Sequence, residues 1–284
     1  MKIPKGLVPL IEDGVIDDVI RSLRSGKEAS VYVVRCGPDV RCAKVYKDMG
    51  QRSFQQRAQY QEGRKVRGSR QERAMRRSTR FGRKEQEMAW KNTEVDALYQ
   101  LSAAGVRVPS PYGFFNGVLL MQLVTDAEGR SAPDLGEGEH SPEQARAYHR
   151  FLMSQIVRML CAGVVHGDLS EYNVLVAADG PVIIDLPQVV SATGNNNARA
   201  MLQRDVSNIT ATLGRFAPEL LTTRYAEEMW ALFEQGLLRP DSVLTGVFVS
   251  DESLADVQGT TLAIEDARDE AMRRQRGREE ANLA

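Results

Sequence analysis

Two stretches, VHGDLSEYN at residues 165–173 and VIID at residues 182–185, decide how this chain folds. Asp168 falls in a predicted loop, Asn173 follows it by five residues, and Asp185 ends an apolar run. This spacing lets one loop turn a carboxylate and a carboxamide toward the same cleft. Asp and Asn are also common in turns, so a purely structural role is the alternative. We favour a functional role, because the second stretch follows the first in order and has a buried-strand pattern.

The chemistry of these three side chains suits phosphoryl transfer. Asp168 would accept or orient the proton of an attacking hydroxyl, and Asn173 and Asp185 would offer hard oxygen ligands to Mg²⁺. Their order resembles the H-x-D-x-x-x-x-N loop of kinase-like phosphotransferases, which a metal-binding aspartate follows. The sequence therefore predicts Asp168 and Asp185 as catalytic residues, and Asn173 and Asp185 as metal ligands.

The composition excludes several classes of protein. The chain has 284 residues and a net charge of −1, which suits one large domain or two packed lobes. Its cysteines, Cys36, Cys42 and Cys161, are odd in number and form no C-x-x-C pair, which argues against a disulfide framework or a zinc site. No apolar run approaches the roughly 20 residues of a membrane helix, and residues 1–10 lack the apolar core of a signal peptide. We expect a soluble cytoplasmic protein that does not contact membranes.

The first 24 residues are predicted to form a small helical segment. Ile16, Val19, Ile20 and Leu23 recur at helical spacing, which predicts a short helix that packs on the elements after it. The segment is too short to be an independent domain.

A polar loop follows, then a strand at residues 31–36, a turn, and a second strand at residues 40–46. The loop can fold over phosphates with its backbone N–H groups, so we assign to ATP binding Ser25, Gly26, Lys27, Glu28, Ala29 and Ser30. Lys44 in the second strand resembles the V-A-I-K lysine that contacts the α- and β-phosphates. The loop has one glycine and no G-x-G-x-x-G, so an ordinary edge-strand lysine is the alternative.

The pattern at residues 85–101 predicts a helix that carries Glu94. In a kinase-like lobe such a glutamate pairs with the strand lysine, here Lys44; a surface glutamate is the alternative. Residues 114–121 then predict a hairpin with Asn116 and Gly117 in its turn.

The residues after that hairpin would connect a β-rich lobe to a helical one. Adenine would bind to the backbone there, with Met121 behind the base and Leu123 beside it, although Met121 could equally be core. Ser141 begins a long helix with a capping box, and Gly163 ends it just before the catalytic loop.

The segment 47–84 is unlike the rest of the chain. Two acidic residues in its 52–84 part, Glu62 and Glu72, oppose twelve basic ones: Arg52, Arg57, Arg64, Lys65, Arg67, Arg70, Arg73, Arg76, Arg77, Arg80, Arg83 and Lys84. Its apolar residues are sparse and aperiodic, which predicts a flexible insertion. A phosphate-rich partner such as RNA and a merely solvated insertion are both open interpretations.

Three motifs together resemble the RIO family of atypical serine/threonine protein kinases, with the RIO1-like branch the most similar: SGKEASVY at 25–32, HGDLSEYN at 166–173 and IDLPQ at 184–188. The resemblance covers about residues 15 to 240. It implies an α+β, bilobal protein-kinase-like fold that uses Mg-ATP. A β-rich N-lobe would span 25–121 with the flexible insertion, a trimmed helical C-lobe 122–250, and a charged tail 251–284.

The resemblance also implies roles for single residues. The phosphate-contacting lysine falls on Lys44, its partner glutamate on Glu94, the catalytic aspartate on Asp168, and the metal ligands on Asn173 and Asp185. In some family members the last aspartate becomes phosphorylated, so that they act as ATPases with an aspartyl-phosphate intermediate. The substrate would be a protein serine or threonine, or the chain itself.

Some features depart from the family pattern. The 191–198 stretch does not match the His-rich run of RIO1-like proteins, which leaves substrate engagement open. The 217–219 stretch spells the Ala-Pro-Glu ending of a conventional activation segment, which we interpret as a coincidence within a helical region. No winged-helix domain precedes the kinase core, which argues against the RIO2 branch.

Two other functions stay open at this point. One is a small-molecule kinase of the aminoglycoside/choline type, which also carries H-G-D but needs an acidic pocket in its C-terminal helices. The other is an assembly ATPase that binds RNA or the small ribosomal subunit through residues 52–84. Mg²⁺ is the expected ion, with Mn²⁺ as an alternative.

Overall fold

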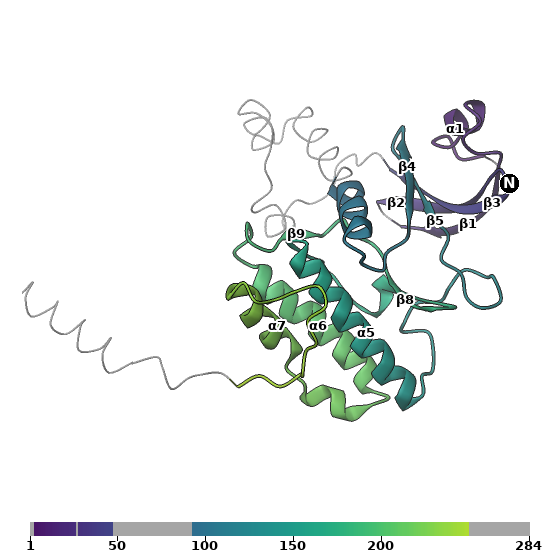
Figure 1. Ribbon diagram of the computed structural model, residues 1–284. Helices are drawn as coiled ribbons and strands as arrows, with labels where there is room; N and C mark the ends of the chain where they lie inside the picture. The colour runs from purple at the N-terminus through teal and green to yellow at the C-terminus, as the bar shows by residue number, and fades with distance from the viewer. Residues whose placement is uncertain (1–2, 27, 48–92, 250–284) are drawn as a thin grey trace, which may run out of the picture. The chain divides into compact units, whose positions relative to one another are not determined.

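The computed structural model describes residues 3–26, 28–47 and 93–249 (Figure 1). The elements below belong to one compact unit, residues 1–247. Lys27, the basic stretch 52–84 and the tail 251–284 lie outside the described residues.

An antiparallel sheet of five strands, in the order β1-β2-β3-β5-β4, forms the first half of the unit. A short helix, α1 (Val8–Glu12), precedes it. The strands are β1 (Asp18–Ser25), β2 (Ala29–Cys36), β3 (Asp39–Tyr46), β4 (Pro111–Phe115) and β5 (Val118–Gln122). Lys44 in β3 stands opposite Val31 of β2 and Leu119 of β5, so it occupies the centre of the sheet and not an edge.

The helix predicted from Ile16 to Leu23 is wrong, because residues 18–25 form strand β1. Irregular pairing with β2, between Val19 and Arg21 and again between Ser22 and Arg24, breaks the alternation that marks a strand in sequence. Ile16 and Val19 are buried against α1 and the sheet. Tertiary pairing therefore decided the structure of this segment, against the apparent helical spacing.

The predicted hairpin is confirmed between β4 and β5. Phe115 pairs with Val118, which leaves Asn116 and Gly117 as a two-residue turn. Their φ angles are +48° and +79°, the left-handed values that such a turn requires.

The second half of the unit is mainly helical. Its helices are α5 (Pro142–Cys161), α6 (Ala198–Gly214) and α7 (Tyr225–Glu234), and a further helix at residues 93–103 precedes β4. The capping box predicted at the start of α5 is present: Ser141 Oγ accepts from Gln144 N, and the Gln144 side chain accepts from Ser141 N. The 217–219 stretch lies at the start of a short 3₁₀ helix, η2 (Pro218–Thr222).

Short strands frame the loops between these helices. They are β6 (Val164–Val165), paired with β9 (Val190–Ser191), and β7 (Val174–Ala177), paired with β8 (Gly180–Ile183). One 3₁₀ turn, η1 (Glu171–Asn173), leads into β7. The catalytic-loop motif thus runs from β6 to β7, and Asp185 follows β8.

One hydrophobic cluster connects the sheet to the helices. It includes Tyr46 and Leu119 of the sheet, Leu98 and Leu101 of helix 93–103, and the buried faces of α5, α6 and α7. This shared core holds the sheet and the catalytic-loop region in one arrangement. Within the described part of the chain, no helix is both long and apolar enough to cross a membrane.

Candidate active site

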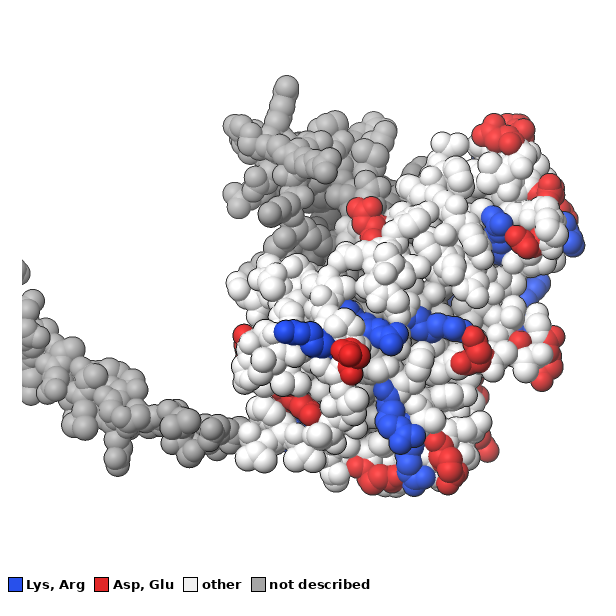
Figure 2. All heavy atoms as spheres, viewed as in Figure 1, with Lys and Arg blue, Asp and Glu red and all other residues white. Residues whose placement is uncertain are grey.

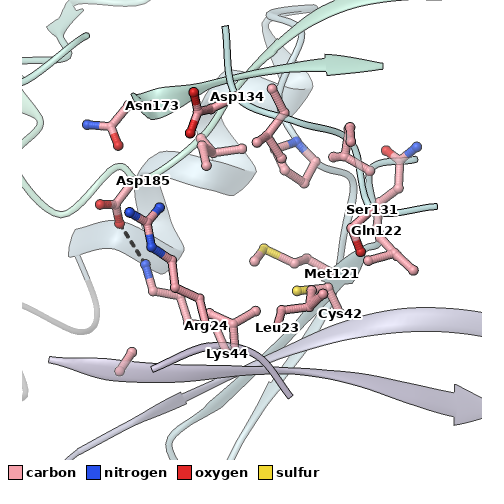
Figure 3. A pocket seen from close by; sticks show the side chains of 18 of the residues that line it. Leu23, Arg24, Cys42, Lys44, Met121, Gln122, Ser131, Asp134, Asn173 and Asp185 are labelled. Atoms are coloured by element: carbon pink, nitrogen blue, oxygen red, sulfur yellow. Dashed lines mark hydrogen bonds and ion pairs between the residues drawn. The ribbon is translucent and has the colours of Figure 1, made fainter. Parts of the chain in front are cut away.

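A cavity of about 790 Å³ lies between the sheet and the loops around β7 and β8. Its wall includes residues from β1, β2, β3 and β5, from helix 93–103, and from the segments 131–137, 172–175 and 184–186. Figure 3 shows its two ends: Cys42, Met121, Gln122 and Ser131 lie at one, and Lys44, Asn173 and Asp185 lie at the other.

Lys44 joins two carboxylates at the second end. Its Nζ donates to Glu94 Oε1 at 2.5 Å and to Asp185 Oδ1 at 2.8 Å. The predicted ion pair between Lys44 and Glu94 is therefore present. Glu94 is buried, and its other oxygen accepts a 2.7 Å hydrogen bond from the Tyr46 hydroxyl. Burial by itself lowers the pKa of Lys44, but Glu94 and Asp185 outweigh it and raise that pKa, so the side chain remains an ammonium.

Asp185 faces the cavity from a strained backbone position. Its φ is +65°, a left-handed value that is uncommon outside glycine. Desolvation raises the pKa of Asp185, but Lys44 outweighs that effect, with help from His166 and Arg24, and the pKa lies below its ordinary value. The side chain is 46% exposed. An ionised carboxylate is thus presented to whatever occupies the cavity.

The residues of the catalytic-loop motif differ in their position relative to the cavity. The Asn173 side-chain amide donates to the Asp168 carbonyl at 2.8 Å, which leaves its oxygen as an available acceptor at the cavity wall. Asp168 is exposed in the loop and does not line the cavity. The structure therefore brings Asn173 and Asp185 together around one space and holds Asp168 beside it through its link to Asn173.

Helix α6 holds this loop by its backbone. Asp205 Oδ2 accepts from Gly167 N at 2.8 Å, and its Oδ1 accepts from Leu169 N at 2.9 Å. Arg204 donates to the Gly167 carbonyl, and Asn208 donates to the Leu169 carbonyl at 2.8 Å. Burial raises the pKa of Asp205 to about 6, although His166 and both backbone N–H groups act in the opposite direction.

Sequence reasoning missed Asp205, although one signal was present. The residue lies between Leu202 and Ile209 at helical spacing, on the buried face of α6, where a carboxylate needs buried partners. The sequence could not identify those partners, because the loop residues Gly167 and Leu169 lie 38 and 36 residues earlier in the chain.

Only some described residues of the predicted ATP-binding loop line the cavity. Gly26, Glu28 and Ala29 line the cavity, whereas Ser25 and Ser30 do not. The hydroxyls of these two serines lie 3.0 Å apart and bridge β1 to β2. Lys27 lies outside the described residues.

At the opposite end, both predicted adenine-side residues, Met121 and Leu123, line the cavity. The sequence did not point to four polar residues that lie elsewhere along the cavity wall: Arg24, Ser131, Asp134 and Glu137. They lie in segments without a recognisable motif, and only the fold brings them together.

The donors at the Lys44 end fit a magnesium ion that also contacts phosphates. Asn173 and Asp185 would hold it, because Mg²⁺ usually takes one or two protein carboxylates or amides and completes its shell with phosphate oxygens and water. The described residues contain no group of three or more His, Cys, Asp or Glu side chains that could hold a metal by themselves.

Comparison with known proteins identifies relatives of the RIO type. A family model described as RIO domain matches residues 30–226. The RIO-type serine/threonine-protein kinase Rio1 of Haloferax volcanii is 32% identical over 203 residues, which cover 70% of this chain and 64% of that protein. The serine/threonine-protein kinase rio1 of Schizosaccharomyces pombe is 29% identical over 213 residues, or 74% of this chain and 41% of that protein. The chain thus spans between about two fifths and just under two thirds of these relatives.

A solved structure gives the fold. The crystal structure of the Rio2 kinase-ADP/Mg²⁺-phosphoaspartate complex from Chaetomium thermophilum aligns with a TM-score of 0.55 and 21% identity, covering 83% of this chain and 68% of that one. The predicted protein-kinase-like, α+β fold is confirmed. The match over residues 30–226, together with the named relatives, shows that this chain belongs to the RIO family, on its RIO1-like branch.

Proposed function

We propose that this chain is an ATP-dependent phosphotransferase of the RIO kinase type, which transfers the terminal phosphoryl group of Mg-ATP. The observation that carries the proposal is Lys44, which binds Glu94 and Asp185 at one end of a nucleotide-sized cavity where Asn173 also projects. This is the set of groups that protein kinases need around the phosphates.

Residues along the cavity would bind different parts of the nucleotide. The apolar wall formed by Val31, Leu175 and Ile184 would pack on the adenine ring, near Met121. Lys44 would bind the phosphates, with Glu94 keeping its ammonium in place.

At the same end of the cavity as Lys44, Asn173 and Asp185 would hold Mg²⁺, with Mn²⁺ as a substitute. The ion would neutralise phosphate charge. Asp168 would orient the acceptor and take its proton.

The acceptor is proposed to be a serine or threonine hydroxyl, or Asp185 itself. Residues 186–197 connect Asp185 to α6 through β9 and short turns, which leaves little chain to build a peptide-binding platform. Asp185 is ionised and faces the cavity, as a carboxylate nucleophile must. The neighbouring Rio2 structure is described as a phosphoaspartate complex, which makes an aspartyl-phosphate intermediate and ATPase turnover the second form of the proposal.

A partnership with RNA or a ribosomal particle is proposed from the basic stretch 52–84, which lies outside the described residues. On the face seen in Figure 2, basic side chains of the described part lie among acidic ones. Attraction of an anionic partner is therefore better assigned to the stretch, where twelve cations face two glutamates. The cytoplasmic location stays a prediction.

The test is incubation of the purified chain with γ-labelled ATP, followed by sorting of the label. Alkali-stable label on serine or threonine supports the kinase, and alkali-labile label that is lost in Asp185→Asn supports the aspartyl-phosphate. Free phosphate released only in the presence of RNA or ribosomal subunits supports the assembly ATPase. If label appears in none of these fractions and no Mg-ATP binds, the proposed function is wrong.

A further inference from the structure

Near its end, strand β1 carries two consecutive residues, Leu23 and Arg24, that both line the cavity. Successive side chains of a regular strand point to opposite faces of its sheet. The pairing with β2 passes from Ser22–Tyr32 to Arg24–Val31, so β1 contains one extra residue at this point. Such a bulge changes the direction of side chains. Here it places Arg24 on the cavity side of the sheet.

Arg24 also stands out by charge. Two basic residues, Arg24 and Lys44, are found among the described residues of the wall, against five acidic ones: Glu28, Glu94, Asp134, Glu137 and Asp185. Lys44 already has two carboxylate partners. Within the described part of the chain, the Arg24 guanidinium makes neither a hydrogen bond nor an ion pair.

Its position relative to Asp185 indicates which part of a nucleotide it would meet. Figure 3 shows the Arg24 side chain running beside Lys44, with the guanidinium directed toward Asp185 and away from Met121 and Gln122. Arg24 is close enough to Asp185 for its charge to favour the ionised carboxylate. Arg24 therefore lies at the end of the cavity assigned to the phosphates and the metal.

We propose that Arg24 binds the terminal phosphate of ATP and thereby makes the cavity prefer ATP to ADP. The inference rests on the proposed function of the same site and adds a residue to it. A guanidinium can donate two parallel hydrogen bonds to a phosphate. Since the Arg24 side chain is exposed and its guanidinium has no hydrogen bond to another described residue, it can turn to the nucleotide at little cost. An arginine in this place also opposes the charge that spreads over the transferring group.

The test compares Mg-ATP and Mg-ADP affinities of the full chain by titration calorimetry. Replacing a charged hydrogen-bond donor by a neutral one is expected to weaken ATP binding about tenfold or more in Arg24→Gln. Mg-ADP affinity should change less than about twofold, because the terminal phosphate is absent. Arg24→Lys keeps the charge without the planar fork and should fall between wild type and Arg24→Gln.

Arg35→Gln is the matched control, because it removes one positive charge from an exposed position of β2 that does not line the cavity. It should leave both affinities unchanged. Thermal unfolding without nucleotide checks that each variant folds; if Arg24→Gln does not, the comparison of Arg24→Lys with wild type decides.

Equal losses for ATP and ADP, or no loss for either, would overturn the role of Arg24. A wild-type chain that binds neither nucleotide would overturn the proposed function as well, so the two failures can be told apart.

Discussion

Asp205 of helix α6 accepts a 2.8 Å hydrogen bond from the backbone N–H of Gly167, which stands 38 residues earlier in the chain. Through this bond, and the equivalent one from Leu169, a buried carboxylate sets the backbone path on both sides of Asp168. An ionised carboxylate shares its negative charge between both oxygens, so both accept strongly, whereas protonation of one oxygen makes that oxygen a much weaker acceptor. The loop that carries the proposed catalytic residue should therefore respond to the protonation of Asp205.

The first prediction concerns acid pH. Burial raises the pKa of Asp205 to about 6, so the carboxylate takes up a proton as the pH falls through that value. One of its two backbone hydrogen bonds is then weakened, and turnover should fall. Asp205→Asn should already be slow at pH 8 and should lack this inflection. Turnover against pH for both proteins is the measurement, and an unchanged inflection in the variant would contradict the assignment.

Stability should move in the opposite direction, which separates this effect from unfolding. Because the folded chain holds the Asp205 proton more tightly than the unfolded chain, this group's contribution to stability is greatest below the unfolded pKa near 4 and is lost as the pH rises through about 6. The difference in Tm between wild type and Asp205→Asn should therefore shift in favour of wild type as the pH falls from 7 to 5.

A second prediction concerns Asp168. Since it is exposed and does not line the cavity, Asp168→Asn should leave Mg-ATP affinity within about twofold and lower phosphotransfer roughly 10²-fold or more. Asp179→Asn, an exposed aspartate between β7 and β8, is the control and should change neither quantity. Near-wild-type turnover of Asp168→Asn would show that Asp168 is not a catalytic residue.

Asp185 should behave in the opposite way in nucleotide binding. Asp185→Ala removes a carboxylate of the proposed metal site and is expected to weaken Mg-ATP binding far more than Asp168→Asn does. The Lys44 ammonium helps to hold the pKa of Asp185 below its ordinary value, so wild-type binding should not depend on this group's titration between pH 5 and 8. Titration of Mg-ATP against both variants tests this, and equal affinities would count against the metal role.

The fourth prediction separates stability from activity at the Lys44–Glu94 pair. Among the described residues, Lys44→Met leaves the buried Glu94 with the Tyr46 hydroxyl as its side-chain hydrogen-bond donor, which should cost about 3 kcal/mol of unfolding free energy. Adding Glu94→Gln removes the unpaired charge and should restore most of that loss, without restoring phosphotransfer. Urea unfolding of the single and double variants measures the effect. A double variant as unstable as Lys44→Met would show that the charge is not the cause.

The fifth prediction concerns the basic stretch 52–84, which lies outside the described residues. If it neutralises several phosphates, RNA affinity should fall steeply with salt. Replacing Arg73, Arg76, Arg77 and Arg80 by Gln should weaken binding and flatten that dependence. The measurement is RNA affinity at several salt concentrations. If neither salt nor the substitutions change that affinity, the stretch is a solvated insertion without a role in RNA binding.

Local signals in the sequence were sufficient for several elements. Asn116-Gly117 between apolar runs predicted a two-residue turn, because few residue pairs accept two positive φ angles. Ser141 and Gln144 predicted the start of α5, because their capping bonds join residues three apart. Each of these signals lies within a few residues of the structure that it specifies. The spacing of Asp168, Asn173 and Asp185 predicted a shared site, and Asn173 and Asp185 do line one cavity, while the catalytic role of Asp168 stays a prediction.

The sequence by itself determined the family, the β-rich and helical halves, and the identity of Lys44, Glu94, Asn173 and Asp185 as residues of one site. Only the tertiary structure decided that residues 18–25 form a strand, that its bulge directs Arg24 into the cavity, and that Asp205 holds the catalytic loop. Strand pairing and the partners of a buried carboxylate come from residues distant in the chain. No local pattern records them, because their free energy arises only when the fold brings those residues into contact.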